Sequence, residues 1–143
     1  MKSKTILEII FTVEGKVING EGRGSNIGFP TANIDISSQY LESGVYGVRV
    51  DIKGSRYFGV MNIGKKPTFH KDYQKNIEIH IFDFNESIYG TSIYAEALFK
   101  IRDEQKFLSV DELKSQINKD IATATSIFKS ITQIRGENNV SFR

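Results

Sequence analysis

The chain has 143 residues, a length that fits one domain able to bury a core without disulfides or metal staples. It contains no cysteine and two histidines, which excludes a disulfide framework, a thiolate metal site and a cysteine nucleophile, and argues against a zinc site. The net charge of +2 is too small to favour nucleic acid or an anionic membrane as a partner, and no apolar run approaches the roughly 20 residues of a membrane span.

The start of the chain does not have the pattern of a secretion signal. A basic flank is followed by a short apolar patch that Glu8 interrupts, and no small-residue cleavage site comes after it. Together with the lack of cysteine, this favours the cytoplasm. We expect residues 1–12 to be a native extension or the remnant of a linker, residues 13–135 to form the domain, and residues 136–143 to be a frayed polar tail.

Short apolar segments that alternate with period two predict about six strands in the first hundred residues. The lysine, glycine and serine at 53–55 predict a hairpin between the third and fourth strands, and 85–87 predicts a second hairpin between the last two. This pattern is typical of a small antiparallel barrel or sandwich. The predicted strands are Val13–Ile18, Thr31–Ile36, Val45–Ile52, Tyr57–Ile63, Ile77–Phe84 and Ser92–Ile101.

The end of the chain changes to a helical pattern. Ser109 and Glu112 form a capping box, in which the serine hydroxyl accepts from the backbone N–H of the glutamate. Gly136 is a plausible end of the helix. Apolar residues three or four positions apart then predict one amphipathic helix: Val110, Leu113, Ile117, Ile121, Ala124, Phe128 and Ile131.

The most unusual segment is rich in glycine. Gly20, Gly22, Gly24 and Gly28 allow a backbone nest for phosphate oxygens, and Arg23 adds a charged donor. A mobile hairpin loop is an equally good interpretation of the glycines alone. The segment is neither a Walker A loop nor a dinucleotide fingerprint, because no Lys-Ser or Lys-Thr pair ends it and it leads into a strand.

Two polar residues follow the glycines on the second predicted strand. Thr31 and Asn33 are two positions apart, so their side chains share a face, with Ala32 on the other side. A hydroxyl and an amide carbonyl are hard oxygen ligands of the kind that Mg²⁺ takes. Ordinary polar residues of a turn or strand would have the same appearance.

Glu78 and His80 share one face of the fifth predicted strand, while the isoleucines beside them take the other. A carboxylate on a partly enclosed face suggests a general base for a hydroxyl group. His80 could orient that base, although a hydrogen-bonded structural histidine is the commoner case. Further on, Arg102 and Phe107 lie in a charged loop before the helix, which is either a solvated loop or a lid that offers them to an anion and a flat ring.

Taken together, these stretches resemble the riboflavin kinases, including the kinase half of bifunctional bacterial enzymes that make FMN and FAD. The resemblance runs from about Gly15 to about Phe128, and the order and spacing of the motifs make it specific. The motifs are Gly20-x-Gly-Arg-Gly, Gly28-Phe-Pro-Thr-Ala-Asn33, Gly44-Val-Tyr-Gly47, Asn62-Ile-Gly-x-x-Pro-Thr-Phe69, Glu78-x-His80, Asp83-Phe84, Tyr89-Gly90, Arg102-Asp-Glu-x-x-Phe107 and the closing helix.

The resemblance implies a six-stranded antiparallel Greek-key (split) barrel packed by the C-terminal amphipathic helix. It implies transfer of the γ-phosphate of ATP to the 5′-hydroxyl of riboflavin, giving FMN and ADP, with Mg²⁺ or another divalent cation. The residue roles that it implies are nucleotide binding by Gly20, Gly22, Arg23, Gly24, Thr31, Asn33 and Tyr89, cation binding by Thr31 and Asn33, base catalysis by Glu78, and flavin binding by Arg102, Gln105 and Phe107.

One departure from the family affects the phosphate site. Relatives often carry a basic residue just after Gly24, where this chain has Ser25 and Asn26. A side-chain phosphate contact is therefore not expected at that point.

Other functions remain open on the residues alone. A flavin- or nucleotide-sensing module would bind without turnover, and an oligonucleotide-binding barrel would need a basic face that the near-neutral charge does not favour. The chain could also be a fragment of a bifunctional enzyme, and without an adenylyl-transfer half it is not expected to make FAD by itself. We expect no nucleic acid, membrane or obligatory protein partner.

Overall fold

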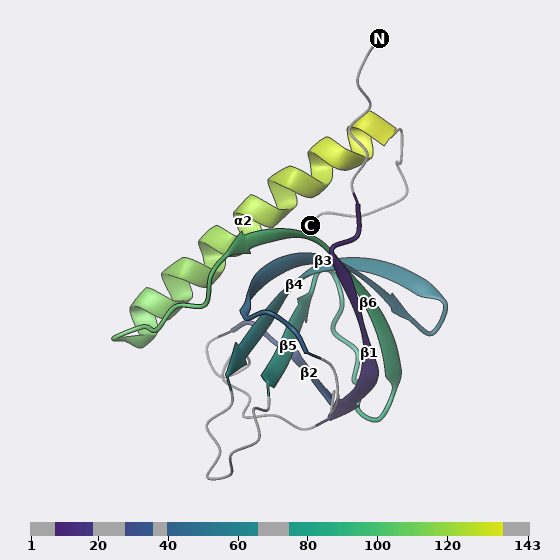
Figure 1. Ribbon diagram of the computed structural model, residues 1–143, viewed down its shortest axis with the longest axis horizontal. Coiled ribbons are helices and arrows are strands. Elements are labelled where there is room, and N and C mark those ends of the chain that lie inside the picture. Colours follow the sequence, from purple (N-terminus) through teal and green to yellow (C-terminus); the bar gives the residue numbers. More distant parts are fainter. Residues whose placement is uncertain (1–7, 19–27, 36–39, 66–74, 136–143) are drawn as a thin grey trace.

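The structure of the protein is a computed structural model that describes residues 8–18, 28–35, 40–65 and 75–135 (Figure 1). Six strands and one long helix follow one another in these ranges. None of the helical structure described there has the length and apolar content to cross a membrane. The elements are β1 (Phe11–Ile18), β2 (Ala32–Asp35), β3 (Gly44–Ile52), β4 (Ser55–Lys65), β5 (Lys75–Ile81), β6 (Ser92–Arg102) and α2 (Val110–Arg135).

The strands close into one antiparallel barrel in the order β1-β2-β5-β4-β3-β6. β3, β4 and β5 are consecutive neighbours, and β2 lies beside β5, which is the strand order of a Greek key. The antiparallel barrel and its C-terminal helix, both predicted from the sequence, are confirmed.

The first predicted hairpin is also confirmed. β3 and β4 pair from Gly44 opposite Ile63 to Ile52 opposite Ser55, with only Lys53 and Gly54 between them. Both residues have a positive φ, 49° and 82°, as a two-residue turn with the twist of the flanking strands requires.

The second predicted hairpin is wrong. β5 pairs with β2 and β4, whereas β6 pairs with β1 and β3, so the two strands lie on opposite sides of the barrel. β5 also ends at Ile81, before the predicted Phe84, and Asp83 has a φ of 56°. The connection contains the buried Phe82 and Ile88, so burial of apolar side chains overrides the local turn signal at 85–87.

Two apolar clusters hold the fold together. One fills the barrel with inward-facing side chains of every strand, such as the fully buried Val48, Ile63 and Ile79. The other joins the outside of the barrel to α2, where the Phe128 ring stacks on Phe58 with centroids 4.1 Å apart. The helix is therefore fixed to the barrel by its own apolar stripe.

The apolar stripe of α2 is buried unevenly along its length. Ser109 Oγ accepts the backbone N–H of Glu112 at 3.1 Å, so the predicted N-terminal cap is confirmed. Ala124 and Phe128, in the second half of the helix, are fully buried, whereas Val110 at its start is 57% exposed. Figure 1 shows α2 lying along one side of the barrel. Its second half is docked, and its first half is left partly open.

Replacing Phe128 with alanine should lower the free energy of unfolding by about 3–5 kcal/mol, because a buried aromatic ring is removed and a cavity is left. Urea denaturation measures this loss. The matched control is Ser130→Ala on the exposed side of the same helix, which should change stability by less than about 0.5 kcal/mol. A similarly small effect of Phe128→Ala would contradict docking of α2 through this cluster.

Candidate active site

A cavity of about 670 Å³ lies between the outer face of the barrel and a cover. The cover consists of the lid, defined as residues 103–109 between β6 and α2, and the first half of α2. The wall from the barrel includes Phe29, Thr31, Asn62, Glu78 and His80. The cavity therefore joins the segment before β2, the strands β4 and β5, and the start of the helix.

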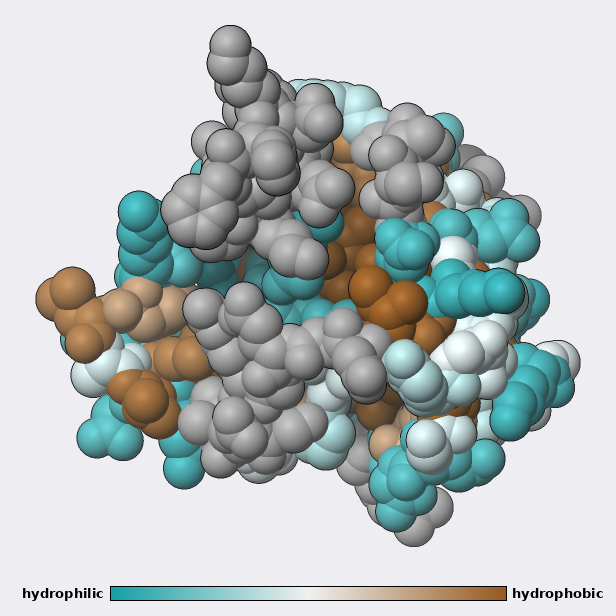
Figure 2. All heavy atoms as spheres, turned by 90° about the horizontal axis from the view of Figure 1, so that it is seen from below, coloured by the Kyte–Doolittle hydropathy of each residue, from teal (hydrophilic) through white to brown (hydrophobic). Residues whose placement is uncertain are grey.

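The cover presents apolar side chains that are not packed into the core. Leu108 and Val110 are 94% and 57% exposed, and Leu113 and Ile117 are half-buried beside the cavity. In Figure 2, brown apolar atoms gather at the left edge, on the side where Figure 1 places the start of α2. A flat apolar ligand could bury this surface.

Polar side chains form a row across three strands on the barrel side. Glu78 of β5 lies directly opposite Asn33 of β2 on one side and Asn62 of β4 on the other. Directly opposite residues share a face of the sheet, so a carboxylate stands between two amides. Asn33 is 8% exposed, and it is not among the described residues that line the cavity.

The carboxylate of Glu78 is held by two donors. The Thr31 hydroxyl donates to Oε1 at 3.1 Å, and the Asn76 side-chain amide donates to Oε2 at 2.9 Å. Each donor engages a different oxygen, so the plane of the carboxylate is fixed. The structure thus brings together Thr31 and Glu78, which the sequence marked separately.

His80 holds the chain just before Thr31. Its Nδ1 lies 2.8 Å from the carbonyl oxygen of Pro30, so this nitrogen carries the proton and donates it. The ring stands between Phe29 and Phe82, with centroid distances of 6.1 and 5.9 Å. His80 is therefore a residue that positions the approach to β2, as its structural interpretation predicted.

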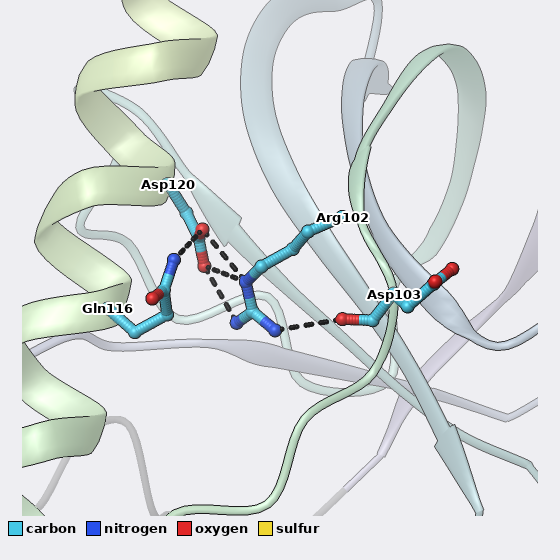
Figure 3. A network of polar contacts seen from close by, with 4 residues as sticks. All are labelled: Arg102, Asp103, Gln116 and Asp120. Atoms are coloured by element: carbon cyan, nitrogen blue, oxygen red, sulfur yellow. Dashed lines mark hydrogen bonds and ion pairs between the residues drawn. The ribbon is translucent and has the colours of Figure 1, made fainter.

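Ion pairs fix the position of the lid where it leaves β6. Arg102 forms a bidentate ion pair with Asp120 of α2, with Nε and Nη2 each 2.9 Å from a carboxylate oxygen (Figure 3). Lys100 donates to the carboxylates of Asp103 at 2.7 Å and Glu42 at 2.9 Å. The hydrogen bond to Asp103 is the main reason that the pKa of Lys100 is raised and that of Asp103 is lowered.

The middle of the lid lies over the cavity. Gln105 and Phe107 both line it, and the Phe107 ring centroid is 5.7 Å from Cζ of Arg102. Gly64 of β4 makes room for the lid, because a Cβ there would lie 2.5 Å from Oε2 of Glu104. The three residues that the resemblance assigns to the flavin, Arg102, Gln105 and Phe107, all line this one cavity.

The proposed nucleotide end is only partly described. The predicted phosphate residues Gly20, Gly22, Arg23 and Gly24 lie outside the described residues. Tyr89 is 63% exposed and is not among the described residues that line the cavity. Its neighbour Gly90 donates its N–H to the carbonyl of Val17 at 2.8 Å, which places Tyr89 near the end of β1.

Sequence reasoning assigned no role to three residues of this region: Asn76, Asp120 and Asn62, the last of which was quoted only as part of a family motif. Asn76 and Asn62 line up with Glu78 along and across the strands, so period two would have marked Asn76 as a neighbour on the same face. Asp120 is 3% exposed, and it stands three positions after Ile117 and four before Ala124. A carboxylate inside the apolar stripe of a helix was the signal that could have revealed it.

The described residues form a closed barrel with a fixed carboxylate in the wall of a covered cavity on its outer face, which is the kind of site that binds a small molecule. The family model described as Flavokinase, riboflavin kinase, matches residues 7–128. The chain belongs to the riboflavin kinase family. The riboflavin kinase family that the sequence predicted is thereby confirmed.

Individual relatives agree with this family. The chain is 44% identical over 119 residues to the RNA-binding riboflavin kinase RibR of Bacillus subtilis, an alignment that covers 83% of this chain and 52% of the relative. It is 42% identical over 125 residues to the bifunctional riboflavin kinase/FMN adenylyltransferase of the same organism, covering 85% and 40% of the two chains. The chain thus spans about half or less of the length of these curated relatives.

A solved structure supports the fold. The chain matches a Streptococcus pneumoniae protein described as a macrolide-efflux protein, with a TM-score of 0.73 and 38% identity. The match covers 79% of this chain and 38% of that one, so the likeness extends over most of the barrel and helix described above.

Replacing Asn76 with alanine should lower the rate of riboflavin phosphorylation roughly 10-fold, because one of the two donors that fix the Glu78 carboxylate is lost. Steady-state kinetics measure the rate, and a thermal melt checks the fold. Asn118→Ala, on the exposed side of α2, is the control and should keep the wild-type rate. A wild-type rate in Asn76→Ala would show that this donor does not position Glu78.

Proposed function

We propose that the protein transfers the γ-phosphate of ATP to the 5′-hydroxyl of riboflavin, giving FMN and ADP. The observation that carries this proposal is the Glu78 carboxylate, which two donors hold in the wall of a covered cavity. The family supports the reaction type, and the cavity of about 670 Å³ has the size of a pocket for a molecule such as riboflavin.

Glu78 acts as the general base in this proposal. Its carboxylate accepts the proton of the riboflavin 5′-hydroxyl while that oxygen forms a bond to the γ-phosphorus and the bond to the leaving ADP breaks. Phosphoryl transfer passes through a loose transition state, so the proton needs to leave only late and a weak base suffices. We expect the base to contribute about 10²–10⁴-fold to the rate.

The oxygen donors beside Glu78 fit a divalent cation. Thr31 donates its hydroxyl proton to Glu78, which leaves the lone pairs of Oγ1 for a cation, and Asn33 offers an amide oxygen on the neighbouring strand. Among the described residues, no group of three or more His, Cys, Asp or Glu side chains could hold a metal. Mg²⁺ would therefore take its other ligands from phosphates and water, and it would neutralise phosphate charge there.

The two ends of the site are proposed to hold different substrates. The apolar first half of α2, together with Gln105 and Phe107 of the lid, suits the flat isoalloxazine ring. The nucleotide is assigned to the side of Thr31, and the resemblance assigns Gly20, Gly22, Arg23, Gly24 and Tyr89 to the nucleotide as well. This arrangement points the ribityl chain toward Glu78, between the two ends.

The wider role of the protein stays a prediction. One relative is named as RNA-binding, and the chain spans 52% of that relative. With a net charge of +2, we expect no RNA binding by this chain, and a cytoplasmic location stays an expectation as well. Others are named as bifunctional, and we expect FMN but no FAD from the residues present here.

The direct test incubates the protein with riboflavin, Mg²⁺ and ATP and separates the flavins by chromatography. Wild type should form FMN, and Glu78→Gln should lower kcat by about 10²-fold or more with much smaller changes in both KM values. Glutamine keeps the size of the side chain, so the melting temperature should stay near wild type.

Two outcomes would contradict the proposal. Riboflavin binding without FMN formation, under any divalent cation, would indicate a flavin-sensing module. An unchanged kcat with a lowered melting temperature in Glu78→Gln would show that the carboxylate has only a structural role beside Thr31 and Asn76.

A further inference from the structure

Asp120 is a buried carboxylate with no role in the chemistry at Glu78. Its side chain is 4% exposed, and it projects from the face of α2 that meets the barrel. Burying a carboxylate is unfavourable unless the charge is paired and hydrogen-bonded. The partners of the Asp120 carboxylate therefore indicate its function.

Figure 3 shows the side chains of Arg102 and Gln116 converging on the Asp120 carboxylate. Arg102 Nε lies 2.9 and 3.1 Å from the two carboxylate oxygens, and Nη2 lies 2.9 Å from Oδ2. The Gln116 amide, one turn earlier on α2, donates to Oδ1 at 3.0 Å. Bidentate pairing fixes the plane of the guanidinium as well as its position.

The same guanidinium also holds the lid. Nη1 of Arg102 donates to the backbone carbonyl of Asp103 at 3.1 Å, at the first residue of the lid. The Phe107 ring lies within 5.7 Å of Cζ, at cation–π distance from the guanidinium. One arginine therefore joins the helix, the start of the lid and the lid's aromatic ring, and both Arg102 and Asp120 line the cavity.

We propose that Asp120 is a positioning residue for the flavin end of the site, acting through Arg102 on Phe107. Arg102 then serves mainly to fix the lid, because its Nε and Nη2 edge is occupied by Asp120 and cannot meet a ligand. A lid held in place before binding loses less conformational freedom when riboflavin enters, which strengthens binding. This inference rests on the proposed function, since it takes riboflavin as the ligand.

A purely structural ion pair is the simpler explanation to be tested. Against it, α2 is already fixed to the barrel two turns later, where Phe128 is fully buried against Phe58 and Phe99. The pair with Asp120 lies instead over the cavity. Its loss should therefore affect the lid more than the docking of the helix.

The barrel supplies a matched control pair. Arg49 and Glu96 form an ion pair between β3 and β6, with Nη2 2.7 Å and Nε 2.8 Å from Oε1. The Arg49 side chain is 18% exposed and that of Arg102 is 19% exposed, so the two arginines are equally buried. Neither Arg49 nor Glu96 is among the described residues that line the cavity.

The experiment compares Asp120→Asn with Glu96→Gln. Riboflavin Kd is measured by quenching of flavin fluorescence, and KM for Mg-ATP and the melting temperature are measured alongside. Asp120→Asn should raise the riboflavin Kd roughly 10-fold or more, with the KM for Mg-ATP within about two-fold of wild type. Glu96→Gln should lower the melting temperature while the riboflavin Kd stays at the wild-type value.

A second variant covers the case in which Asp120→Asn does not fold. Arg102→Lys keeps the positive charge beside Asp120 but loses the planar fork, and it should weaken riboflavin binding in the same way. An unchanged riboflavin Kd in either folded variant overturns the inference. Wild type that binds riboflavin without making FMN contradicts the kinase reaction alone, whereas wild type that does not bind riboflavin contradicts both.

Discussion

The docking of only half of α2 is the constraint on which the rest of the structure depends. Phe128 is fully buried against the outside of the barrel, and Ala124 beside it is equally inaccessible, whereas Val110 at the other end of the stripe is largely exposed. Because the second half packs on the barrel and Asp120 pairs with Arg102 of β6, the first turns of α2 can stand away from the barrel without unfolding. The cavity lies in the space between the start of α2, the lid and the barrel.

The alternation of side chains along the strands determines which residues face this cavity. Alternate residues of β5 point inward as buried isoleucines, so Glu78 and His80 must point outward, toward the cavity. The same alternation turns Asn76 to the side of Glu78, and strand register places Asn33 and Asn62 opposite it. The fold thus surrounds one carboxylate with groups that can donate to it or share a cation with it.

Local patterns predicted the parts of this molecule that local chemistry determines. Apolar residues at every second position predicted the strands, and the capping box of Ser109 and Glu112 predicted the start of α2. The true pairing partners of β5 and of β6 could not be obtained this way, because the turn signal at 85–87 is local while the partners are set by burial across the whole barrel. Glu78 was found because its carboxylate is conspicuous on a strand of isoleucines. Asn76 and Asp120 were not assigned, because an amide at a strand start and an acid on a helix are common on surfaces, and only the contacts with Glu78 and Arg102 distinguish them.

The measurement that tests this account most directly is backbone hydrogen exchange with and without riboflavin. If the cavity between the barrel and the cover holds the flavin, amides of the lid and of the first half of α2 should exchange more slowly when riboflavin is present. The second half of α2, already docked by Phe128, should exchange at the same rate in both states and serves as the internal reference. Equal exchange of the lid and of the first half of α2 with and without bound riboflavin would contradict the assignment of this cavity to the flavin.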